Sequence, residues 1–303
     1  MTRFPVIALR SVDLDTTDLV ASEKFYRDIW GLDVVERTAD RVYLRATGSD
    51  HHVLALHAAA HVALKSVTFR CELATDLDDI ARAAPAHGCE ILKSPSPSRE
   101  PGGGTMLVVR EPQGGVLRFV LGDQRHADAG PVANRPLRLA HVNINSVDPD
   151  AAAEFYQRVL GFRLADRSKA MAFVRCNADH HAVVITQAPV NGLNHIAFLV
   201  PDWESVMRAS GRMVDHDYPI AWGVGRHGPG DNVFAYFVDP LGVVIEYTAE
   251  VLQVDDDYVV HGPDYWVWPP GRTDQWGIAP PKAEFVKAAQ TAVRHAAPDG
   301  SAA

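Results

Sequence analysis

The sequence predicts an α+β fold made from two copies of one module. Residues 7–31 and 137–161 share one plan: an alternating strand, a polar segment, a helix with Phe-Tyr at the same place, and a closing glycine. Both halves then carry a His-His pair and end in two apolar runs around a proline-containing bend, the pattern of a β-hairpin. We therefore expect a strand–helix–strand–strand order that occurs twice in each module.

Helices and strands can be placed in chain order along both copies. In the second copy the helix has a defined start, because Asp148 can cap it and Pro149 suits its first turn. A later strand in each half, KSVTFRC or NHIAFLV, precedes a further helix. We expect these helices at about residues 76–87 and 202–213, and short strands at 42–44 and 53–56 with counterparts in the second half.

The last hairpin of the second half brings two functional side chains together. Its arms, Val233–Val238 and Val243–Tyr247, flank Asp-Pro-Leu-Gly. A three-residue loop with Gly242 in the left-handed region places Tyr236 opposite Glu246 on one face of the sheet. A carboxylate among Val, Ile and Tyr is costly to bury unless it is paired or bound to a cation. Glu246 is therefore either a metal ligand or an edge-strand side chain that points to water.

Length, composition and charge exclude several classes of protein. The chain has 303 residues, 47% of them hydrophobic and 22% charged, which suits one large or two medium domains. A net charge of −9 leaves no basic excess for binding nucleic acid. The N-terminus meets charges too soon for a signal peptide, and no apolar run approaches the ~18 residues of a membrane span. The three cysteines match neither a disulfide framework nor a zinc pattern, so we expect a cytoplasmic protein without a membrane partner.

The boundary between the two copies is predicted at residues 124–135, a polar stretch with glycine and proline. We expect residues 1–126 to form a structural module without a metal site. Residues 136–250 are expected to form a catalytic module with a metal, and residues 251–303 an extension beyond it.

The extension divides into two parts. Residues 258–281 are rich in Trp, Tyr, Pro and Gly and should pack either as a lid over the second cleft or as a subunit contact, because exposed tryptophan patches are unfavourable. The pattern of residues 282–297 predicts a short amphipathic helix.

One half of the chain serves as an internal control for the other. When the two Phe-Tyr pairs are aligned, three side chains suited to metal binding stand opposite residues that are not. These pairs are His141 and Ser11, His195 and Ser66, and Glu246 and Arg118. Two histidines and one carboxylate form the facial triad of non-haem Fe(II) oxygenases, which leaves one face of the ion open. A lone histidine on an apolar strand is more often a core residue, but the three together favour a metal site in the second half.

The spacing of these residues resembles that of a known family. The shared features are His141, the His-His pair before His195, Gly-Arg-His at 225–227, Tyr236 before an Asp-Pro turn, and Ile-Glu-Tyr around Glu246. They resemble the type I extradiol ring-cleavage dioxygenases of the vicinal oxygen chelate superfamily, and most of all its homoprotocatechuate 2,3-dioxygenase-like members. The resemblance implies tandem βαβββ modules of the glyoxalase-like fold. It also implies an oxidoreductase of aromatic hydrocarbon catabolism that binds Fe(II), with Mn(II) as the alternative, and takes a catechol and O2. The expected assembly is a homo-oligomer, a tetramer in similar enzymes.

The resemblance also implies roles for individual residues. His181 matches the acid–base histidine beside the metal, and its type suits that work because imidazole titrates near neutrality. Tyr236 would donate a hydrogen bond to a substrate oxygen, and His227 would hold the opposite edge of the substrate. The residues expected to line the substrate pocket are Asn143, Phe173, Trp222 and Arg272.

The substrate pocket departs from that of the most similar enzymes at two positions. Trp222 and Thr273 stand where those enzymes have arginines, which leaves Arg272 as the one cation. A hydrophobic wall with one cation suits a larger or aromatic-substituted catechol. Arg272 could instead pair with a nearby aspartate on the surface.

Two other functions fit the same scaffold. A metal-dependent isomerase or lyase of the glyoxalase type would use a chelated ion but no dioxygen. A non-catalytic protein that binds small molecules would need no metal and would have degraded ligand positions, as the first half has. We expect zinc, or no metal, in the purified protein if either alternative holds.

Overall fold

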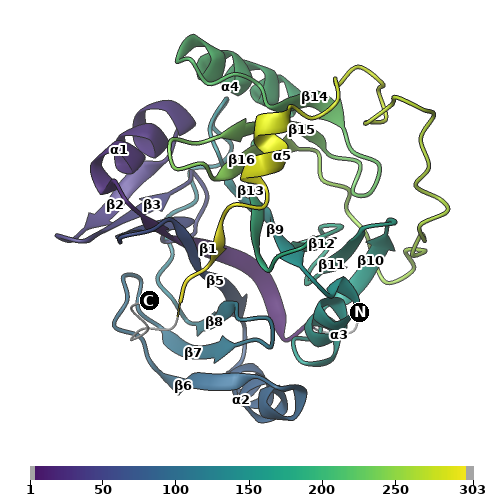
Figure 1. Cartoon of the computed structure of the whole chain (residues 1–303). Coiled ribbons are helices and arrows are strands. Elements are labelled where there is room, and N and C mark those ends of the chain that lie inside the picture. Colours follow the sequence, from purple (N-terminus) through teal and green to yellow (C-terminus); the bar gives the residue numbers. More distant parts are fainter. Residues whose placement is uncertain (1–3, 298–303) are drawn as a thin grey trace.

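The computed structural model describes residues 4–297, which form four βαβββ units in succession (Figure 1). The first unit comprises β1 (Val6–Thr16), α1 (Leu19–Lys24) with its continuation η1 (Phe25–Trp30), β2 (Asp33–Arg37), β3 (Arg41–Arg45) and β4 (Leu54–Ala58). The second comprises β5 (Ala63–Cys71), α2 (Ala74–Ala83) with η2 (Ala84–His87), β6 (Glu90–Pro97), β7 (Thr105–Arg110) and β8 (Val116–Leu121). These two units make up the first module.

The second module repeats this order. Its first unit comprises β9 (Arg138–Ser146), α3 (Pro149–Arg158), β10 (Arg163–Arg167), β11 (Met171–Arg175) and β12 (Val183–Gln187). Its second unit comprises β13 (Gly192–Leu199), α4 (Trp203–Asp215), β14 (Trp222–Arg226), β15 (Val233–Val238) and β16 (Val244–Ala249).

The same pairing joins the two units of each module. The first strands of the units pair antiparallel, β1 with β5 and β9 with β13, and each first strand also runs parallel to the last strand of its own unit. The strand orders are β2-β3-β4-β1-β5-β8-β7-β6 and β10-β11-β12-β9-β13-β16-β15-β14. The functional strands β9, β13 and β16 therefore lie side by side in the middle of the second sheet.

Each unit contains one strand more than the residue pattern alone predicted. The strand directly after the helix was missing, whereas the βαβββ order that the resemblance implied is confirmed. Three of the four missed strands lack clear apolar alternation: β2 reads DVVER, β10 reads RLADR and β14 reads WGVGR. Their place in the sheet comes from pairing with distant strands rather than from their own composition.

The helices begin close to where their capping residues predict. Asp148 caps α3 by accepting a hydrogen bond from the Ala151 amide at 3.0 Å, and Pro149 is the first helical residue. Asp202 caps α4 in the same way through Ser205, at 2.7 Å. The helix expected near residues 76–87 is α2, continued by the single turn of η2.

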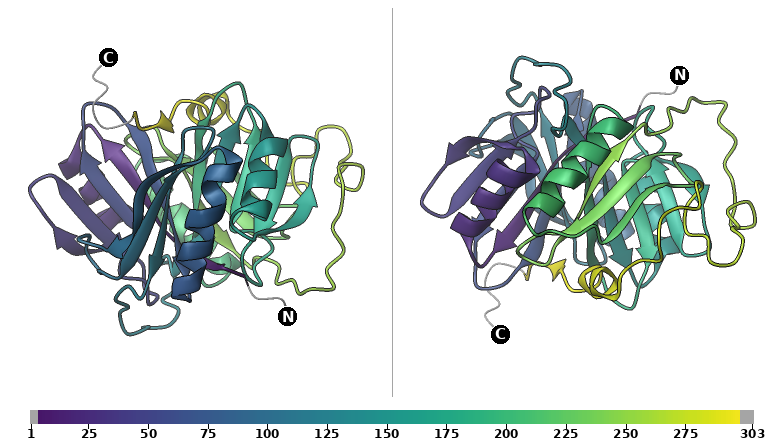
Figure 2. Two further views of the ribbon diagram at one scale, coloured as in Figure 1. Left: turned by 90° about the horizontal axis from the view of Figure 1, so that it is seen from below. Right: turned by 90° about the horizontal axis from the view of Figure 1, so that it is seen from above.

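The two modules interlock through their helices. The ring of Trp30, at the end of η1, stacks on Tyr247 of the second module with 3.6 Å between ring centroids. The Tyr26 hydroxyl donates a hydrogen bond of 2.7 Å to the Asp239 carboxylate, also in the second module. Figure 2 shows α1 and α4 next to each other. The end of the helical segment of the first unit therefore contacts the metal-ligand hairpin of the second module.

The hairpin around Gly242 has the register that the sequence predicted. Tyr236 pairs with Glu246, and Gly242 has a φ of 82°. The Asp239 carboxylate accepts hydrogen bonds from the amides of Leu241 and Val243, at 2.9 and 2.8 Å, and so closes the turn.

The C-terminal extension returns to the gap between the modules. After an irregular stretch, it forms α5 (Glu284–Ala289) and the short strand β17 (Arg294–His295), shown in yellow in Figure 1. The prediction of a helix over residues 282–297 is therefore wrong in extent. The end of the segment is extended because β17 pairs with both β13 and β5. Within residues 4–297, no helix has the length and apolar character needed to cross a membrane.

Candidate metal centre

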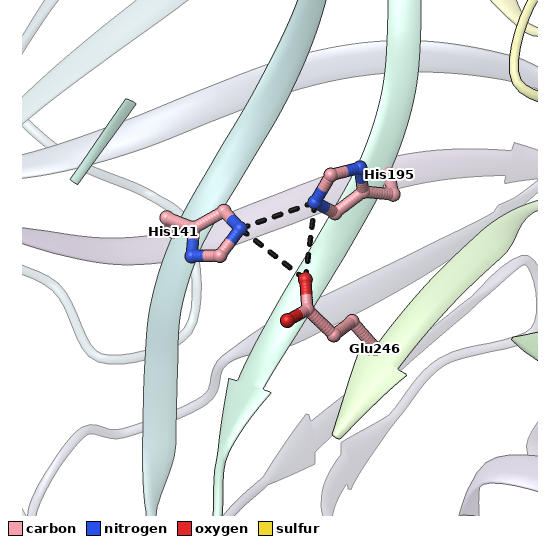
Figure 3. Close-up of side chains that lie close together, drawn as sticks. All are labelled: His141, His195 and Glu246. Carbon is pink, nitrogen blue, oxygen red and sulfur yellow. Dashed lines mark hydrogen bonds and ion pairs between the residues drawn. The ribbon is translucent and has the colours of Figure 1, made fainter. Parts of the chain in front are cut away.

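Three side chains from neighbouring strands converge at the centre of the second sheet (Figure 3). The pairing of β9, β13 and β16 sets His141 and Glu246 on either side of Ala197. His195 lies two residues before Ala197 on the same strand. The small side chain of Ala197 leaves the space between the strands to the two imidazoles and the carboxylate. All three ligand candidates are buried.

The spacing of the ligand atoms fits a metal ion. His141 Nε2 lies 3.1 Å from His195 Nε2 and 3.4 Å from Glu246 Oε2, and His195 Nε2 lies 3.2 Å from the same oxygen. Ligands about 2.1 Å from one ion stand roughly 3.0 Å apart at right angles and roughly 3.4 Å apart in a tetrahedron. Within residues 4–297, Glu246 Oε2 is a buried atom without a hydrogen-bond partner. A cation between the three atoms would satisfy it.

The protonation states at this site also suit metal binding. Burial would raise the pKa of Glu246, but the imidazoles of His141 and His195 hold it well below its usual range. Burial lowers the pKa of His195 to about 4, although Glu246 opposes that effect. At neutral pH the carboxylate is therefore charged and His195 is neutral, with a lone pair available to a cation.

A chain of amides fixes the orientation of His195. Its Nδ1 lies 2.9 Å from Asn194 Oδ1, so Nδ1 carries the proton and Nε2 presents its lone pair to the centre. The same amide oxygen accepts a hydrogen bond of 2.8 Å from Gln290, and Asn194 donates one of 2.8 Å to Asn145. Sequence reasoning missed Gln290, which reaches this point only because the extension folds back onto β13.

The first module holds a salt bridge where the second holds the cluster. Arg118, equivalent to Glu246, donates to the buried Asp13 at 2.7 Å, and His57 contacts the same carboxylate at 3.1 Å. Ser66, equivalent to His195, is buried nearby. No second group of His, Cys, Asp and Glu suited to a metal occurs in residues 4–297. A fixed guanidinium supplies the positive charge in the first module.

A cavity of about 410 Å³ opens beside the three ligands. His181, Tyr236 and His227, to which the resemblance assigns catalytic roles, all line it. The Tyr236 hydroxyl lies 3.1 Å from His227 Nε2 and 3.5 Å from His195 Nε2, and the His181 ring lies 4.4 Å from that of His141. These three side chains therefore surround the open side of the metal centre.

Burial governs the charge of the side chains around the cavity. It lowers the pKa of His181 well below the ordinary value and that of His227 to about 3, so both imidazoles are neutral at pH 7. Burial, reinforced by the Glu246 charge, raises the pKa of Tyr236 well above its usual value. Tyr236 therefore keeps its proton and can act as a hydrogen-bond donor.

Three of the four predicted substrate residues line the cavity and one does not. Asn143, Phe173 and Trp222 form parts of the wall. Arg272 is exposed, and its guanidinium folds back over Gly277, outside the cavity. The prediction that Arg272 lines the pocket therefore needs correction, since its guanidinium lies against Gly277 and not in the cavity wall.

A lysine takes the place expected for the arginine. Lys282 lines the cavity with its Nζ 4.3 Å from the centroid of the Trp222 ring. It makes no ion pair within residues 4–297, and its Nζ donates a hydrogen bond of 3.4 Å to Gln290 Oε1. Burial lowers the pKa of Lys282 to about 8. The sequence held no signal for this residue, because its position depends on the return of the extension.

The aromatic part of the extension also reaches the cavity. Trp266 and Trp268 lie in its wall, whereas Val259, Tyr265 and Ile278 of the same segment are exposed. One side of the extension therefore covers the cavity, as a lid would, and the other side faces outward.

Comparison with known proteins agrees with this architecture. The sequence matches the Glyoxalase/Bleomycin resistance protein/Dioxygenase superfamily over residues 8–119 and 138–247, one match for each module. The chain belongs to this superfamily. The family resemblance found in the motifs is therefore confirmed, as is the tandem fold that it implied.

Several known proteins match the chain along most of its length. Metapyrocatechase 2 of Cupriavidus necator is 29% identical over 294 residues, which span 88% of this chain and 87% of that protein. The Mn(II)-bound glyoxalase of Novosphingobium aromaticivorans is 31% identical with a TM-score of 0.87, covering 93% of this chain and 94% of that one. A variant of homoprotocatechuate 2,3-dioxygenase from B. fuscum is 24% identical with a TM-score of 0.80, over 91% of this chain and 80% of that one. This last similarity supports the fold alone.

Proposed function

We propose that the protein is an extradiol dioxygenase that opens the ring of a catechol with O2. The observation that carries this proposal is the buried cluster of His141, His195 and Glu246, open on one side to a cavity that also presents His181 and Tyr236. The similarity to metapyrocatechase 2 over almost the whole chain supports it. The donor set favours Fe(II), and Mn(II) accepts the same ligands.

The metal contributes what the side chains cannot. A bound Fe(II) or Mn(II) ion supplies a Lewis acid that lowers the pKa of a coordinated hydroxyl and a path for electrons between the catechol and dioxygen. His141, His195 and Glu246 would hold it. Asn194 would keep the lone pair of His195 directed at the ion.

The side chains around the cavity would handle protons and position the ring. His181 is neutral and borders the metal centre, so it would accept a substrate proton and return it as the ring opens. Tyr236 keeps its proton and would donate a hydrogen bond to a substrate oxygen. His227, hydrogen-bonded to Tyr236, would hold the opposite side of the substrate.

The cavity wall favours a substituted catechol over catechol itself. Phe173, Trp222 and Trp266 supply aromatic surface for a substituent, and Lys282 supplies a cation at the same wall. An acidic substituent would form an ion pair with Lys282, whereas a phenyl group would stack on the aromatic side chains.

Anaerobic loading followed by oxygen tests the proposed reaction. The protein is loaded with Fe(II) or Mn(II) under anaerobic conditions, and 3,4-dihydroxyphenylacetate, 3-methylcatechol or 2,3-dihydroxybiphenyl is added before air. We expect oxygen uptake and a yellow ring-opened product from at least one of them. Loaded protein that consumes no oxygen with any of the three would contradict the proposal.

A second candidate function is supported by the Mn(II)-bound glyoxalase. A metal-dependent isomerase on this scaffold would act on the hemithioacetal of methylglyoxal and glutathione without consuming O2. The two functions can be distinguished under anaerobic conditions, because isomerisation proceeds without O2 and ring cleavage does not. Anaerobic turnover of the hemithioacetal together with no turnover of catechols would favour the isomerase.

We also infer that the enzyme works as a homo-oligomer. Val259, Tyr265, Val267 and Ile278 expose apolar surface on the outer side of the extension, which a contact with another copy would cover. Light scattering of the purified protein tests this inference. A monomer at all concentrations would refute it.

A further inference from the structure

The two adjacent histidines of the second module lie in a hydrogen-bonded chain that ends on a buried carboxylate. His180 and His181 belong to the loop before β12, and their Nδ1 atoms are 3.0 Å apart. On its other side, His180 Nε2 lies 2.9 Å from Asp166 Oδ2. His180 and Asp166 are fully buried and do not touch the metal ligands, so neither has a role in the reaction described above.

The partners of Asp166 determine how the protons are arranged along this chain. Asp166 accepts from the Tyr258 hydroxyl at 3.1 Å and from the His261 backbone amide at 2.7 Å. A carboxylate so placed is an acceptor for His180 Nε2–H as well. In its singly protonated form, His180 then has its lone pair on Nδ1 and accepts the Nδ1–H of His181. Nε2 of His181 is left with the lone pair on the side of the cavity.

We infer that Asp166 and His180 are positioning residues that fix the tautomer of His181, so that its Nε2 faces the substrate as a proton acceptor. The inference rests on the proposed function, because it explains how His181 is prepared for that work. It also gives the C-terminal extension a second role, since Tyr258 and His261 donate hydrogen bonds to Asp166, the carboxylate at the end of the hydrogen-bonded chain.

The first module shows the same pair of histidines without this arrangement. His51 and His52, the counterparts of His180 and His181, also have their Nδ1 atoms 3.0 Å apart. In that pair, however, Nε2 of His52 contacts the guanidinium of Arg10. The position equivalent to Asp166 is Glu36, which is exposed. A bulge precedes both positions, after Leu164 and after Val34. The buried carboxylate therefore accompanies the metal cluster and is absent from its counterpart.

The substitution Asp166→Asn reverses the direction of hydrogen-bond donation from residue 166 through His180 to His181, and it keeps all three side chains in place. The His261 amide can only donate, so the side-chain oxygen of the asparagine stays with it, and the new NH2 group faces His180. His180 must then accept at Nε2 and donate from Nδ1, which moves the proton of His181 to Nε2. We expect kcat to fall roughly 10- to 100-fold while metal content and KM change little. Glu36→Gln is the matched control and should leave kcat unchanged.

A double-mutant cycle separates this role from a structural one. If Asp166 acts through His181, then Asp166→Asn should lower kcat by less than about threefold in a His181→Phe background. His180→Gln, which removes the imidazole link, should lower kcat in the same background-dependent way. An equal loss in both backgrounds, an unchanged kcat in the wild-type background, or loss of metal from both variants would overturn the inference.

A spectroscopic measurement tests the tautomer without relying on turnover. Long-range ¹H–¹⁵N spectra of the Zn(II)-loaded, ¹⁵N-histidine-labelled chain distinguish a protonated from an unprotonated ring nitrogen, and the His181→Phe spectrum identifies the signals of His181. We expect Nδ1–H in the wild type and Nε2–H in Asp166→Asn. Nε2–H in the wild type would refute the inference even if catechols are cleaved. Failure of all catechols with Nδ1–H observed would instead count against the proposed function.

Discussion

At the scale of single residues, the metal site depends on side chains that one module has and the other lacks. His195 offers a neutral imidazole whose lone pair is held towards His141 and Glu246 by Asn194. Ser66 occupies the equivalent place in the first module, where Arg118 already neutralises the buried carboxylate of Asp13. Equivalent substitutions in the two modules should therefore have unequal effects.

We predict that His195→Ala abolishes metal binding, because the two remaining ligands cannot hold the ion at a useful affinity. Ser66→Ala should bind the metal like the wild type and retain its activity. Metal content after loading and desalting, determined by mass spectrometry, measures both. Equal losses in the two variants would mean that the metal does not reside in the second module alone.

We predict that His181→Phe keeps its metal and loses roughly 10²- to 10⁴-fold in kcat, because the phenyl ring fills the space but cannot transfer a proton. The measurement is the rate of oxygen uptake at saturating catechol, with metal content determined on the same sample. An unchanged kcat would remove His181 from the reaction.

The sequence revealed some of these residues and concealed others for a physical reason. His141, His195 and Glu246 could be found because the repeat supplies a counterpart for each, and because a buried charge on an apolar hairpin needs a partner. Asp166 and Lys282 could not, since their surroundings come from chain segments roughly 100 residues away or from the folding back of the extension. Nothing in the local pattern distinguishes Asp166 from Glu36.

At the scale of elements, the extension after β16 completes the site built by the sheet. It supplies Trp266 and Trp268 to the cavity wall, Lys282 beside Trp222, and Gln290 to the support of His195. Its irregular course explains why sequence patterns did not predict it, whereas the Asp-Pro-Leu-Gly hairpin, whose turn chemistry is local, was predicted with its register.

We predict that Lys282→Met raises the KM for 3,4-dihydroxyphenylacetate about tenfold and leaves the KM for 4-ethylcatechol unchanged, because only the acid can pair with the ammonium group. With a pKa of about 8, Lys282 is charged below that pH and neutral above it. In the wild type, the KM for the acid should therefore rise above pH 8 while that of the neutral catechol does not.

Steady-state kinetics of both substrates across this pH range provides the measurement. Lys287→Met is the matched control, since Lys287 lies on α5 but is exposed and pairs with Glu284. A parallel rise in KM for both substrates would show that Lys282 shapes the cavity without recognising charge.

At the scale of the whole molecule, the interlocked modules hold the metal-ligand hairpin in place. Tyr247, next to Glu246, is stacked on Trp30 of the first module, and Asp239 in the hairpin turn accepts from Tyr26. The module without a metal cluster therefore supports the one that carries it. The repeat was visible in the sequence, but these contacts between the modules were not, because a helix pattern does not show which distant residues the end of a helix will contact.

We predict that Tyr26→Phe lowers the free energy of unfolding by about 1–3 kcal/mol, because it leaves a buried carboxylate without its hydroxyl donor. Burial raises the pKa of Asp239 to about 6. A carboxyl group with a raised pKa destabilises the fold as pH rises from its unfolded pKa through its folded one, so the ionised group needs the donor most above pH 6. The difference in the free energy of unfolding between the wild type and Tyr26→Phe, measured by urea denaturation, should be larger at about pH 7.5 than at about pH 5. A deficit independent of pH would contradict this account of Asp239.

We propose that the metal-loaded second module inserts both atoms of dioxygen into a catechol. Mass spectrometry of the product formed by the Fe(II)-loaded protein under ¹⁸O2 tests it most directly, once the most active catechol is known. We predict a ring-opened product that carries both labelled atoms, with the aldehyde or ketone oxygen subject to exchange with water, and no product from His195→Ala. A product without label, or an intact ring after complete loading with metal, would contradict the account.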